Sequence, residues 1–410
     1  MTQKSMLAWG LGILAIIVVA IAIWQTRSDD DRLPVSAKIG GLLPFTGDLA
    51  AFGESTLSGI ELAVAEVNAA GGVIGGRLEL IVGDTETNPQ AGVIAAQKLA
   101  GVDGVSGIVG AMASGVTIPV AQSVAAVSGV PMVSPSATSP VITGLADNDF
   151  LFRTTPHDAV QGVLLADLVT DQGIDRVAML YRNDDYGKGL AEAFAVNYTG
   201  HITSIIGYEP GQPTYGAELS QSAAAGEVEA LVMISFPEEG IPILRRALEQ
   251  GFFERFVFTD GMKANDVVEA IGQQYLETSF GTAQAAVENE GLELYRAHYE
   301  AIIGEIPDDR PFIENAYDGT ILLALAIEQA GTGDPVAVRD ALRAVANPPG
   351  EVILPSQFAL AKELIAAGTE INYEGAAGAQ DFDDEGDVTG TFGHWVFRGG
   401  SVEQIGLLGN

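Results

Sequence analysis

The sequence predicts an α/β fold with two lobes, each built on a parallel sheet, and three observations support this prediction. Short apolar runs typical of strands alternate with helical segments from residue 35 onwards, which is the pattern of a parallel sheet covered by helices. The alternation occurs in two consecutive series, and the second begins near residue 158. A chain of 410 residues with 47% hydrophobic content also exceeds one ordinary domain and can bury a large core.

The first series forms the first predicted lobe. Its short apolar runs predict strands, and the segments between them have the length and apolar content of helices. The predicted strands are residues 37–43, 78–83, 105–110 and 130–134, and the predicted helices are residues 56–68, 89–99 and 117–127. A further helix is expected to begin at Thr138, with Pro140 in its first turn, where proline is favoured.

The second series forms the second predicted lobe. Strands are predicted at residues 177–181, 201–206, 230–234 and 256–259, and helices at residues 158–171, after Asp185 and at 241–250. Two more helices, at residues 291–303 and 312–330, follow without a linker that would free them as a third domain. We therefore expect these two helices to pack back on the first lobe.

Two short polar segments follow neighbouring strands of the first series. The segment Gly110-Ala-Met-Ala-Ser114 follows one strand, and Ser134-Pro-Ser-Ala-Thr-Ser-Pro140 follows the next. Because a connecting helix makes the two strands parallel, both segments should open on the same edge of the sheet. Hydroxyls such as those of Ser114 and Thr138, together with free backbone N–H groups, would hold the carboxylate of a small ligand there. The alternative is that these residues serve only as turns and caps.

Composition excludes several classes of function. The 54 acidic and 20 basic residues give a formal net charge of -34, which argues against binding to nucleic acid or to an anionic membrane surface. The chain has no cysteine, so disulfides, thiolate metal sites and cysteine nucleophiles are excluded. The four histidines are far apart in the sequence and none lies at the spacing of a metal-binding helix, so we expect no metal and no cofactor. A high-salt habitat is one explanation of the acidity.

The N-terminal residues 1–32 are expected to lie outside the fold. Residues 6–24 form an apolar run of 19 residues behind Lys4, about the length that spans a bilayer. This run is either a transmembrane anchor or a signal peptide, because Ala20-Ile-Ala22 matches a cleavage site. Both alternatives imply export, with the polar residues 26–32 as a tether.

Several motifs recur in an order that resembles a known family. They are Pro44-Phe-Thr-Gly47, Gly59-Ile-Glu-Leu-Ala63, Asn68-Ala-Ala-Gly-Gly72, Ser134-Pro-Ser-Ala-Thr138, Asp185-Tyr-Gly-Lys-Gly189, Thr259-Asp-Gly261 and Tyr373-Glu-Gly375. As an ordered set they resemble the type I periplasmic binding proteins for branched-chain and other amino acids. The resemblance covers nearly everything after residue 35 and implies three crossovers, near residues 158, 283 and 386. One lobe would then be residues 33–157 plus 283–385, and the other residues 158–282 plus 386–410.

The resemblance implies a function without chemistry of its own. It implies an extracytoplasmic, monomeric substrate-binding protein of an ABC uptake transporter, which closes two lobes on a free amino acid and delivers it to the membrane permease. The expected ligand is a branched-chain amino acid or another with a small or apolar side chain. The alternatives are a membrane-tethered receptor domain that senses a ligand, and an amide- or urea-binding protein of the same family.

The resemblance also assigns roles to individual residues. Ser114 and Thr138 match hydroxyls that bind the ligand carboxylate, and the backbone N–H groups of Ser136 and Thr138 complete that site. Asp260 matches the acidic residue that receives the ligand ammonium, for which a carboxylate is the natural partner. The remaining expected contacts are aromatic: Tyr186 over the ligand, Phe52 as a wall that is equally compatible with plain core, and Phe236 lining the cleft.

Overall fold

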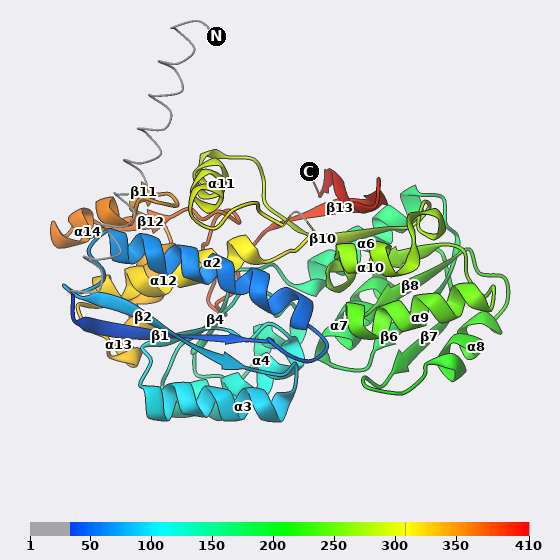
Figure 1. The fold of residues 1–410 in the computed structure, drawn as a ribbon, viewed down its shortest axis with the longest axis horizontal. Coiled ribbons are helices and arrows are strands. Elements are labelled where there is room, and N and C mark those ends of the chain that lie inside the picture. Colours follow the sequence, from blue (N-terminus) through cyan, green and yellow to red (C-terminus); the bar gives the residue numbers. More distant parts are fainter. Residues whose placement is uncertain (1–32, 308, 410) are drawn as a thin grey trace, which may run out of the picture.

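The computed structural model describes residues 33–307 and 309–409, and these form two lobes, each with a central sheet (Figure 1). Residues 6–24, with the expected anchor or signal peptide, lie outside the described residues. The predicted fold class is confirmed, because parallel strands dominate both sheets.

The first lobe contains a five-stranded parallel sheet in the order β2-β1-β3-β4-β5. Its strands are β1 (Val35–Leu43), β2 (Arg77–Asp84), β3 (Gly107–Gly110), β4 (Met132–Ser134) and β5 (Leu151–Arg153). The helices of the first part of the chain are α2 (Ala50–Ala69), α3 (Pro89–Lys98), α4 (Ser114–Val120) and α5 (Ala126–Ser128). A π-helical stretch, Ala121–Ala125, joins α4 to α5, so the predicted connecting helix is present and begins at Ser114.

Later segments of the chain complete the first lobe. They are α11 (Glu290–Ile302), α12 (Ile313–Ala330), α13 (Pro335–Ala346), α14 (Phe358–Ala366) and the two-stranded sheet of β11 (Glu351–Ile353) and β12 (Ile371–Tyr373). Helix α12 lies beside α2 and is buried along almost its whole length, because it packs against α2, α13 and the sheet (Figure 1). The expectation that the helices after residue 290 return to the first lobe is therefore confirmed.

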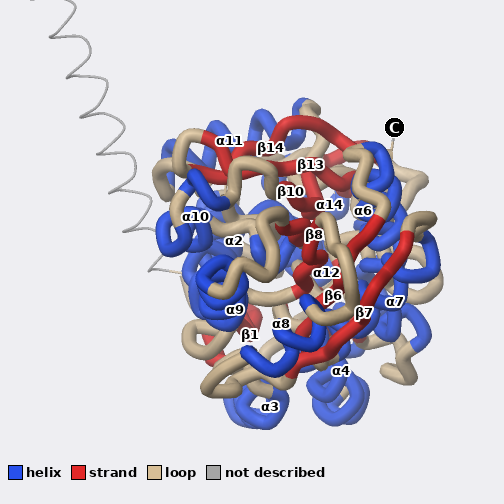
Figure 2. The backbone as a smooth tube through the Cα atoms, turned by 90° about the vertical axis from the view of Figure 1, so that its right-hand side faces the viewer, coloured by secondary structure: helices blue, strands red, loops and turns tan. Residues whose placement is uncertain are grey.

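The second lobe contains a seven-stranded sheet in the order β14-β13-β10-β9-β8-β6-β7. Its strands are β6 (Arg176–Arg182), β7 (His201–Tyr208), β8 (Ala230–Ile234), β9 (Phe256–Phe258), β10 (Phe280–Ala285), β13 (Thr391–Arg398) and β14 (Ser401–Leu408). The helices are α6 (Asp158–Asp171), α7 (Asp185–Asn197), α8 (Gly216–Ala223), α9 (Pro237–Glu249) and α10 (Asn265–Ile271). Figure 2 shows the twist of this sheet from β7 to the antiparallel β13–β14 hairpin, which the sequence did not predict.

The chain passes between the sheets three times, between β5 and α6, between β10 and α11, and between β12 and β13. Strand β10 continues to Ala285, past the expected crossing at residue 283, because its residues pair with β13 up to that point. At the third crossing, residues beyond the expected boundary at 385 still bind to the first lobe. Gly386 accepts a hydrogen bond from the Arg153 amide at 2.9 Å, and Asp387 forms a buried ion pair with the Arg153 side chain.

The segment after Thr138 differs from the prediction. It forms a five-residue 3₁₀ helix, η3 (Pro140–Gly144), rather than an α-helix, and Ser139 caps it by accepting a hydrogen bond from the Val141 amide at 3.4 Å. The prediction of a helix N-terminus at Thr138 was wrong because Arg153 donates hydrogen bonds to the carbonyls of Ala137 and Ser139, which holds this segment in an extended path.

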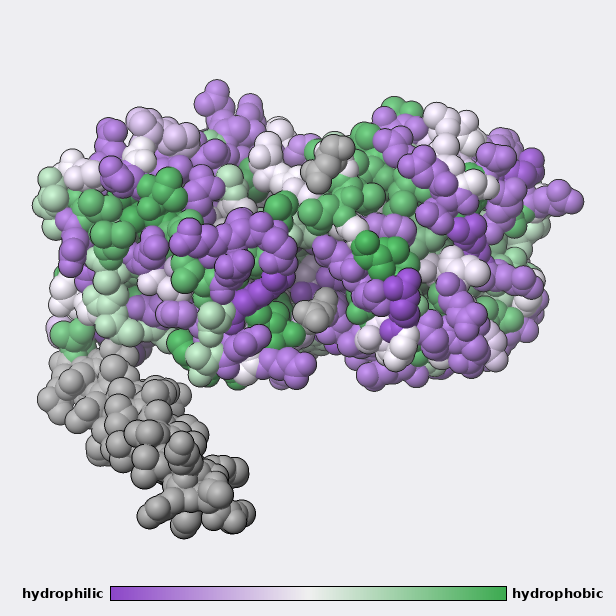
Figure 3. All heavy atoms as spheres, turned by 90° about the horizontal axis from the view of Figure 1, so that it is seen from above, coloured by the Kyte–Doolittle hydropathy of each residue, from purple (hydrophilic) through white to green (hydrophobic). Residues whose placement is uncertain are grey.

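Hydrophilic residues cover most of the molecular face shown in Figure 3. With a formal net charge of -34, the folded chain brings many negative charges close together, and this repulsion opposes folding.

We expect sodium chloride to stabilise the protein strongly, because salt shortens the screening length from about 30 Å at 0.01 M to about 3 Å at 1 M. The midpoint of thermal unfolding, followed by circular dichroism, should rise by several degrees over that range. A midpoint that stays constant or falls would show that surface repulsion is unimportant for stability.

Candidate binding site between the lobes

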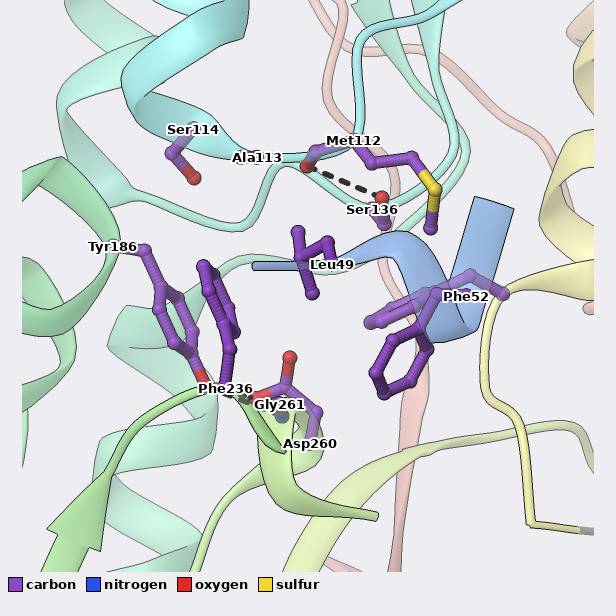
Figure 4. A pocket seen from close by; sticks show the side chains of 11 residues that line it. Leu49, Phe52, Met112, Ala113, Ser114, Ser136, Tyr186, Phe236, Asp260 and Gly261 are labelled. Carbon is purple, nitrogen blue, oxygen red and sulfur yellow. Dashed lines mark hydrogen bonds between the residues drawn. The ribbon is translucent and has the colours of Figure 1, made fainter. Parts of the chain in front are cut away.

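A cavity of about 340 Å³ lies between the two lobes (Figure 4). The lining residues come from both lobes: Leu49, Phe52, Met112, Ala113, Ser114, Ser136, Tyr186, Phe236, Asp260, Gly261 and Phe312. Six of the seven residues predicted from the sequence are in this set, and Thr138 is the exception.

Hydroxyl groups line the wall that belongs to the first lobe. Strands β3 and β4 are adjacent and parallel, so the segments that follow them reach the same edge. Ser114 begins α4 after β3, and its hydroxyl accepts a hydrogen bond from the Ser139 amide at 3.2 Å. The Ser136 hydroxyl, which follows β4, donates to the Met112 carbonyl at 3.2 Å (Figure 4). Both side chains are buried at the cavity edge.

Aromatic rings and a carboxylate form the wall that belongs to the second lobe. Asp260 follows β9, and its Oδ1 accepts a hydrogen bond from the Tyr186 hydroxyl at 2.9 Å. The Tyr186 ring stacks on Phe236 with 5.3 Å between centroids and 10° between planes (Figure 4). Burial raises the pKa of Asp260 to about 6, although hydrogen bonds from Tyr186 and Gln161 oppose the shift.

A second carboxyl group lies behind the cavity. Asp158 begins α6 at the first crossing and is fully buried, and neither carboxylate oxygen has a hydrogen-bond partner other than Thr138 among the described residues. Burial and the nearby charge of Asp260 hold the pKa of Asp158 well above its usual range. The Thr138 hydroxyl lies close enough to this carboxyl group to oppose the rise of its pKa, and in the described chain neither side chain has a hydrogen-bond partner other than the other one.

Sequence reasoning did not assign Asp158 to the site, nor five of the lining residues: Leu49, Met112, Ala113, Gly261 and Phe312. In the sequence, Asp158 is simply the first residue of the helix predicted at 158–171. No pattern among its neighbours indicates that it is buried where the chain crosses between the lobes. Leu49, Met112 and Phe312 come from three separate loops, and single apolar residues in loops have no periodicity.

Ion pairs and hydrogen bonds join the lobes on both sides of the cavity. On one side Arg182 of β6 binds Asp48 of the first lobe, with 2.8 Å between Nη1 and Oδ2. On the other side the Asn265 amide of α10 donates to Asp309 Oδ2 at 2.9 Å, and Arg310 pairs with Asp266. The structure is therefore closed around the cavity, with hydroxyls on one lobe and a carboxylate on the other. Such a fold and site define a two-lobed protein with a cavity of mixed polar and apolar lining between its lobes.

Comparison with known proteins agrees with this class. The family model described as "Periplasmic binding protein" matches residues 36–360. The substrate-binding protein BasB of the chemotactic signal transduction system of Halobacterium salinarum is 28% identical, covering 84% of this chain and 82% of BasB. The leucine-, isoleucine-, valine-, threonine- and alanine-binding protein of Pseudomonas aeruginosa is 31% identical, covering 80% of this chain and 86% of the relative.

Solved structures agree as well. The crystal structure of LivJ from Streptococcus pneumoniae in complex with isoleucine superposes with a TM-score of 0.75 at 25% identity, covering 90% of this chain and 99% of LivJ. The chain belongs to the type I periplasmic binding proteins, in the branch of the Leu/Ile/Val-binding proteins. This is a family of solute-binding proteins.

No single helix in the described part of the chain is long and apolar enough to cross a membrane. One pair there, α12 and α13, has the length and composition to do so only when taken together, and it is bent by 108° at the break.

Proposed function

We propose that this protein is the extracytoplasmic receptor of an ABC uptake transporter and that it binds a free amino acid with an apolar side chain. The observation that carries the proposal is the pairing of Ser114 and Ser136 on one lobe with Asp260 on the other, across a closed cavity. A zwitterion presents a carboxylate to the Ser114 hydroxyl and to the backbone N–H of Ser136, whose own hydroxyl already donates to the Met112 carbonyl, and an ammonium to the Asp260 carboxylate. One such ligand bridges both lobes and stabilises the closed state.

The ammonium subsite includes more than Asp260. The carboxyl groups of Asp158 and Asp260 interact electrostatically inside the protein, and the side-chain oxygens of Asp158 and Thr138 lack hydrogen-bond partners other than each other among the described residues. Buried polar groups require partners, and an ammonium supplies both positive charge and three donors. We assign Asp260, Asp158 and Thr138 to this subsite. Thr138 then serves the ammonium end of the ligand rather than its carboxylate, which differs from the role expected from the sequence.

The side chain of the ligand is expected to be apolar. Leu49, Phe52, Met112 and Phe312 line the cavity without offering a side-chain hydrogen-bonding group, and Phe236 and Tyr186 present ring faces. This environment favours leucine, isoleucine or valine over polar amino acids. The names of the Leu/Ile/Val-binding relatives point to the same class.

Isothermal titration with L-leucine, L-isoleucine, L-valine, leucinamide and acetamide tests the proposal. The free amino acids should bind, and the amides, which lack the carboxylate, should bind weakly or not at all. Binding of amides in preference to the amino acids would favour the amide-binding alternative.

Replacing Ser114 with alanine should weaken binding of L-leucine by about 1–3 kcal/mol, as expected when a charged group loses a buried hydrogen bond. Ser123→Ala is a matched control, because Ser123 lies further along the same helical segment and its hydroxyl donates to the Pro119 carbonyl at an exposed position. Equal affinities of Ser114→Ala and wild type for L-leucine would remove Ser114 from the carboxylate subsite.

A sensory role is the second candidate, favoured by the similarity to BasB, a protein of a chemotactic signal transduction system. Transport and sensing share the same site and differ in the membrane partner. Deletion of the gene should abolish uptake of radiolabelled leucine by the cells if the protein serves transport, and should abolish only the behavioural response to leucine if it serves sensing.

A further inference from the structure

A cluster of charged residues joins the lobes beside the cavity. Arg182, at the end of β6, is the centre of the cluster, and its side chain is 6% exposed. Its Nη1 binds both Asp48 Oδ2 at 2.8 Å and Glu239 of α9, and its Nε binds Asp184 Oδ2 at 2.6 Å. One guanidinium therefore faces three carboxylates. Of these, only Asp48 belongs to the first lobe.

Glu239 is the most deeply buried carboxylate of the cluster. The residue is 3% exposed, and its Oε2 has no hydrogen-bond partner among the described residues. Because Asp48 and Glu239 bind the same nitrogen of Arg182, their carboxylates are close neighbours. The charge of one guanidinium cannot compensate three carboxylates, of which Glu239 is buried and Asp48 and Asp184 are partly exposed, whereas a single proton on Glu239 removes one negative charge and supplies a donor for the unpaired oxygen.

The surroundings of Glu239 favour this proton. Burial raises the pKa of Glu239 to about 8, and Asp48 adds to the shift, while Arg182 opposes it. Other titratable groups near Glu239 are the hydroxyls of Tyr208 and Tyr215, whose pKa values burial also raises, and Asp184. The helix that bears Glu239 also carries Glu238, Arg245, Arg246 and Glu249 around the surface hollow that Glu239 and Asp48 line.

We propose that closing the lobes takes up one proton, which is held by Glu239 against Asp48, so that closure is sensitive to pH. Opening moves Asp48 away with the first lobe and leaves Glu239 with Arg182 and Asp184, in a wetter environment where the ionised form is favoured. The closed state therefore binds more protons than the open state. Acid pH stabilises the closed state, and alkaline pH weakens it.

The cluster is in direct contact with the cavity wall. The Arg182 guanidinium lies over the Phe236 ring, 4.9 Å from its centroid, and Phe236 lines the cavity. Ligand affinity is thus linked to the same proton. As pH rises towards 8, ligand affinity should fall by up to about tenfold per pH unit, which is the limit for linkage to a single proton. Above the pKa of Glu239 in the closed state, affinity should become constant.

The first experiment, which rests on the proposed function, counts the protons taken up when L-leucine binds. Isothermal titration at pH 7 and pH 8 in buffers of different ionisation enthalpy gives this number for wild type, Glu239→Gln and Asp48→Asn. Wild type should take up about one proton more than Glu239→Gln at pH 7 and about half a proton more at pH 8, as expected for a group with a pKa of about 8. Asp48→Asn should reduce the uptake. Glu238→Gln, on the exposed side of the same helical turn, is the control and should match wild type.

The second experiment needs no ligand. Because the chain has no cysteine, dyes can be placed at Val102→Cys and Val196→Cys, two exposed positions in different lobes. Energy transfer in the ligand-free protein should change towards that of an open form between pH 6 and pH 9, and the change should disappear when Glu239→Gln is added.

The two experiments separate the inference from the proposed function. Failure of L-leucine to bind to wild type would contradict the proposed ligand class and leave the energy-transfer result to decide the inference. Equal proton uptake in wild type and Glu239→Gln would overturn the inference even if leucine binds tightly, and so would energy transfer that is independent of pH in both proteins.

Discussion

Replacing Asp260 with asparagine is expected to weaken the binding of L-leucine by about 2–5 kcal/mol, because it leaves the ligand ammonium buried without its ionic partner. The substitution preserves shape and removes only charge, so the Tyr186 hydroxyl can still donate to the remaining oxygen. Isothermal titration measures the loss. Glu254→Gln, an exposed change in the loop before β9, is the matched control and should bind as wild type does.

The pH dependence of binding provides a second test of Asp260. Burial in the closed lobes raises the pKa of Asp260 to about 6, and a bound ammonium lowers it, since opposite charge favours the ionised form. The closed complex therefore binds fewer protons at Asp260 than the closed protein without ligand. In Glu239→Gln, which lacks the proton proposed to be linked to closure, affinity should fall as pH decreases below about 6, and this acid limb should be absent when Asp260→Asn is added. Equal binding of N-acetyl-L-leucine and L-leucine would refute the ammonium role of Asp260.

Replacing Arg153 with alanine is expected to reduce the free energy of unfolding by about 3–5 kcal/mol, the usual effect of removing one partner of a buried ion pair. The Arg153 side chain is fully buried, and its Nε donates to Asp387 Oδ1 at 2.6 Å. It also donates to the Ser139 carbonyl at 3.0 Å and to the Thr143 hydroxyl at 2.9 Å. Arg153 thus ties the segment after Thr138 to the third crossing between the lobes.

Urea unfolding measures this effect as a lower midpoint with an unchanged slope. The control is Arg398→Ala, which removes an exposed pair with Glu403 and should reduce stability by about 0–1 kcal/mol. If Arg153→Ala does not fold, Asp387→Asn removes the charge of the partner and weakens the same pair. A midpoint as high as that of Arg398→Ala would show that the buried pair contributes little.

Local patterns were sufficient to predict most of the fold. The strand Ala230–Ile234 and the helix Asp158–Asp171 have the bounds expected from the sequence, because an uninterrupted apolar run and a helical pattern are properties of neighbouring residues. The β13–β14 hairpin was not predicted. It belongs to the second lobe because β13 pairs with β10, and that pairing depends on chain segments far apart in the sequence.

Most of the candidate site, like most of the fold, could be predicted from the sequence. Ser114 and Ser136 follow adjacent parallel strands of the first lobe, whose topology brings such positions to one edge, whereas Asp260 follows a strand of the second lobe and was assigned through the family resemblance. For Thr138 we propose the ammonium end of the ligand instead of the carboxylate end expected from the sequence, because the sequence does not show that Asp158 lies beside it.

The sequence by itself determined the alternation of strands and helices, the acidic surface and the polar residues at the strand ends, because these depend on composition and on short-range periodicity. Only the tertiary structure decided which residues meet when the lobes close. Asp48 reaches Arg182 and Glu239 across the cleft, and the apolar Leu49, Met112 and Phe312 converge on one cavity. Such contacts depend on the packing of whole lobes, for which neighbouring residues carry no signal.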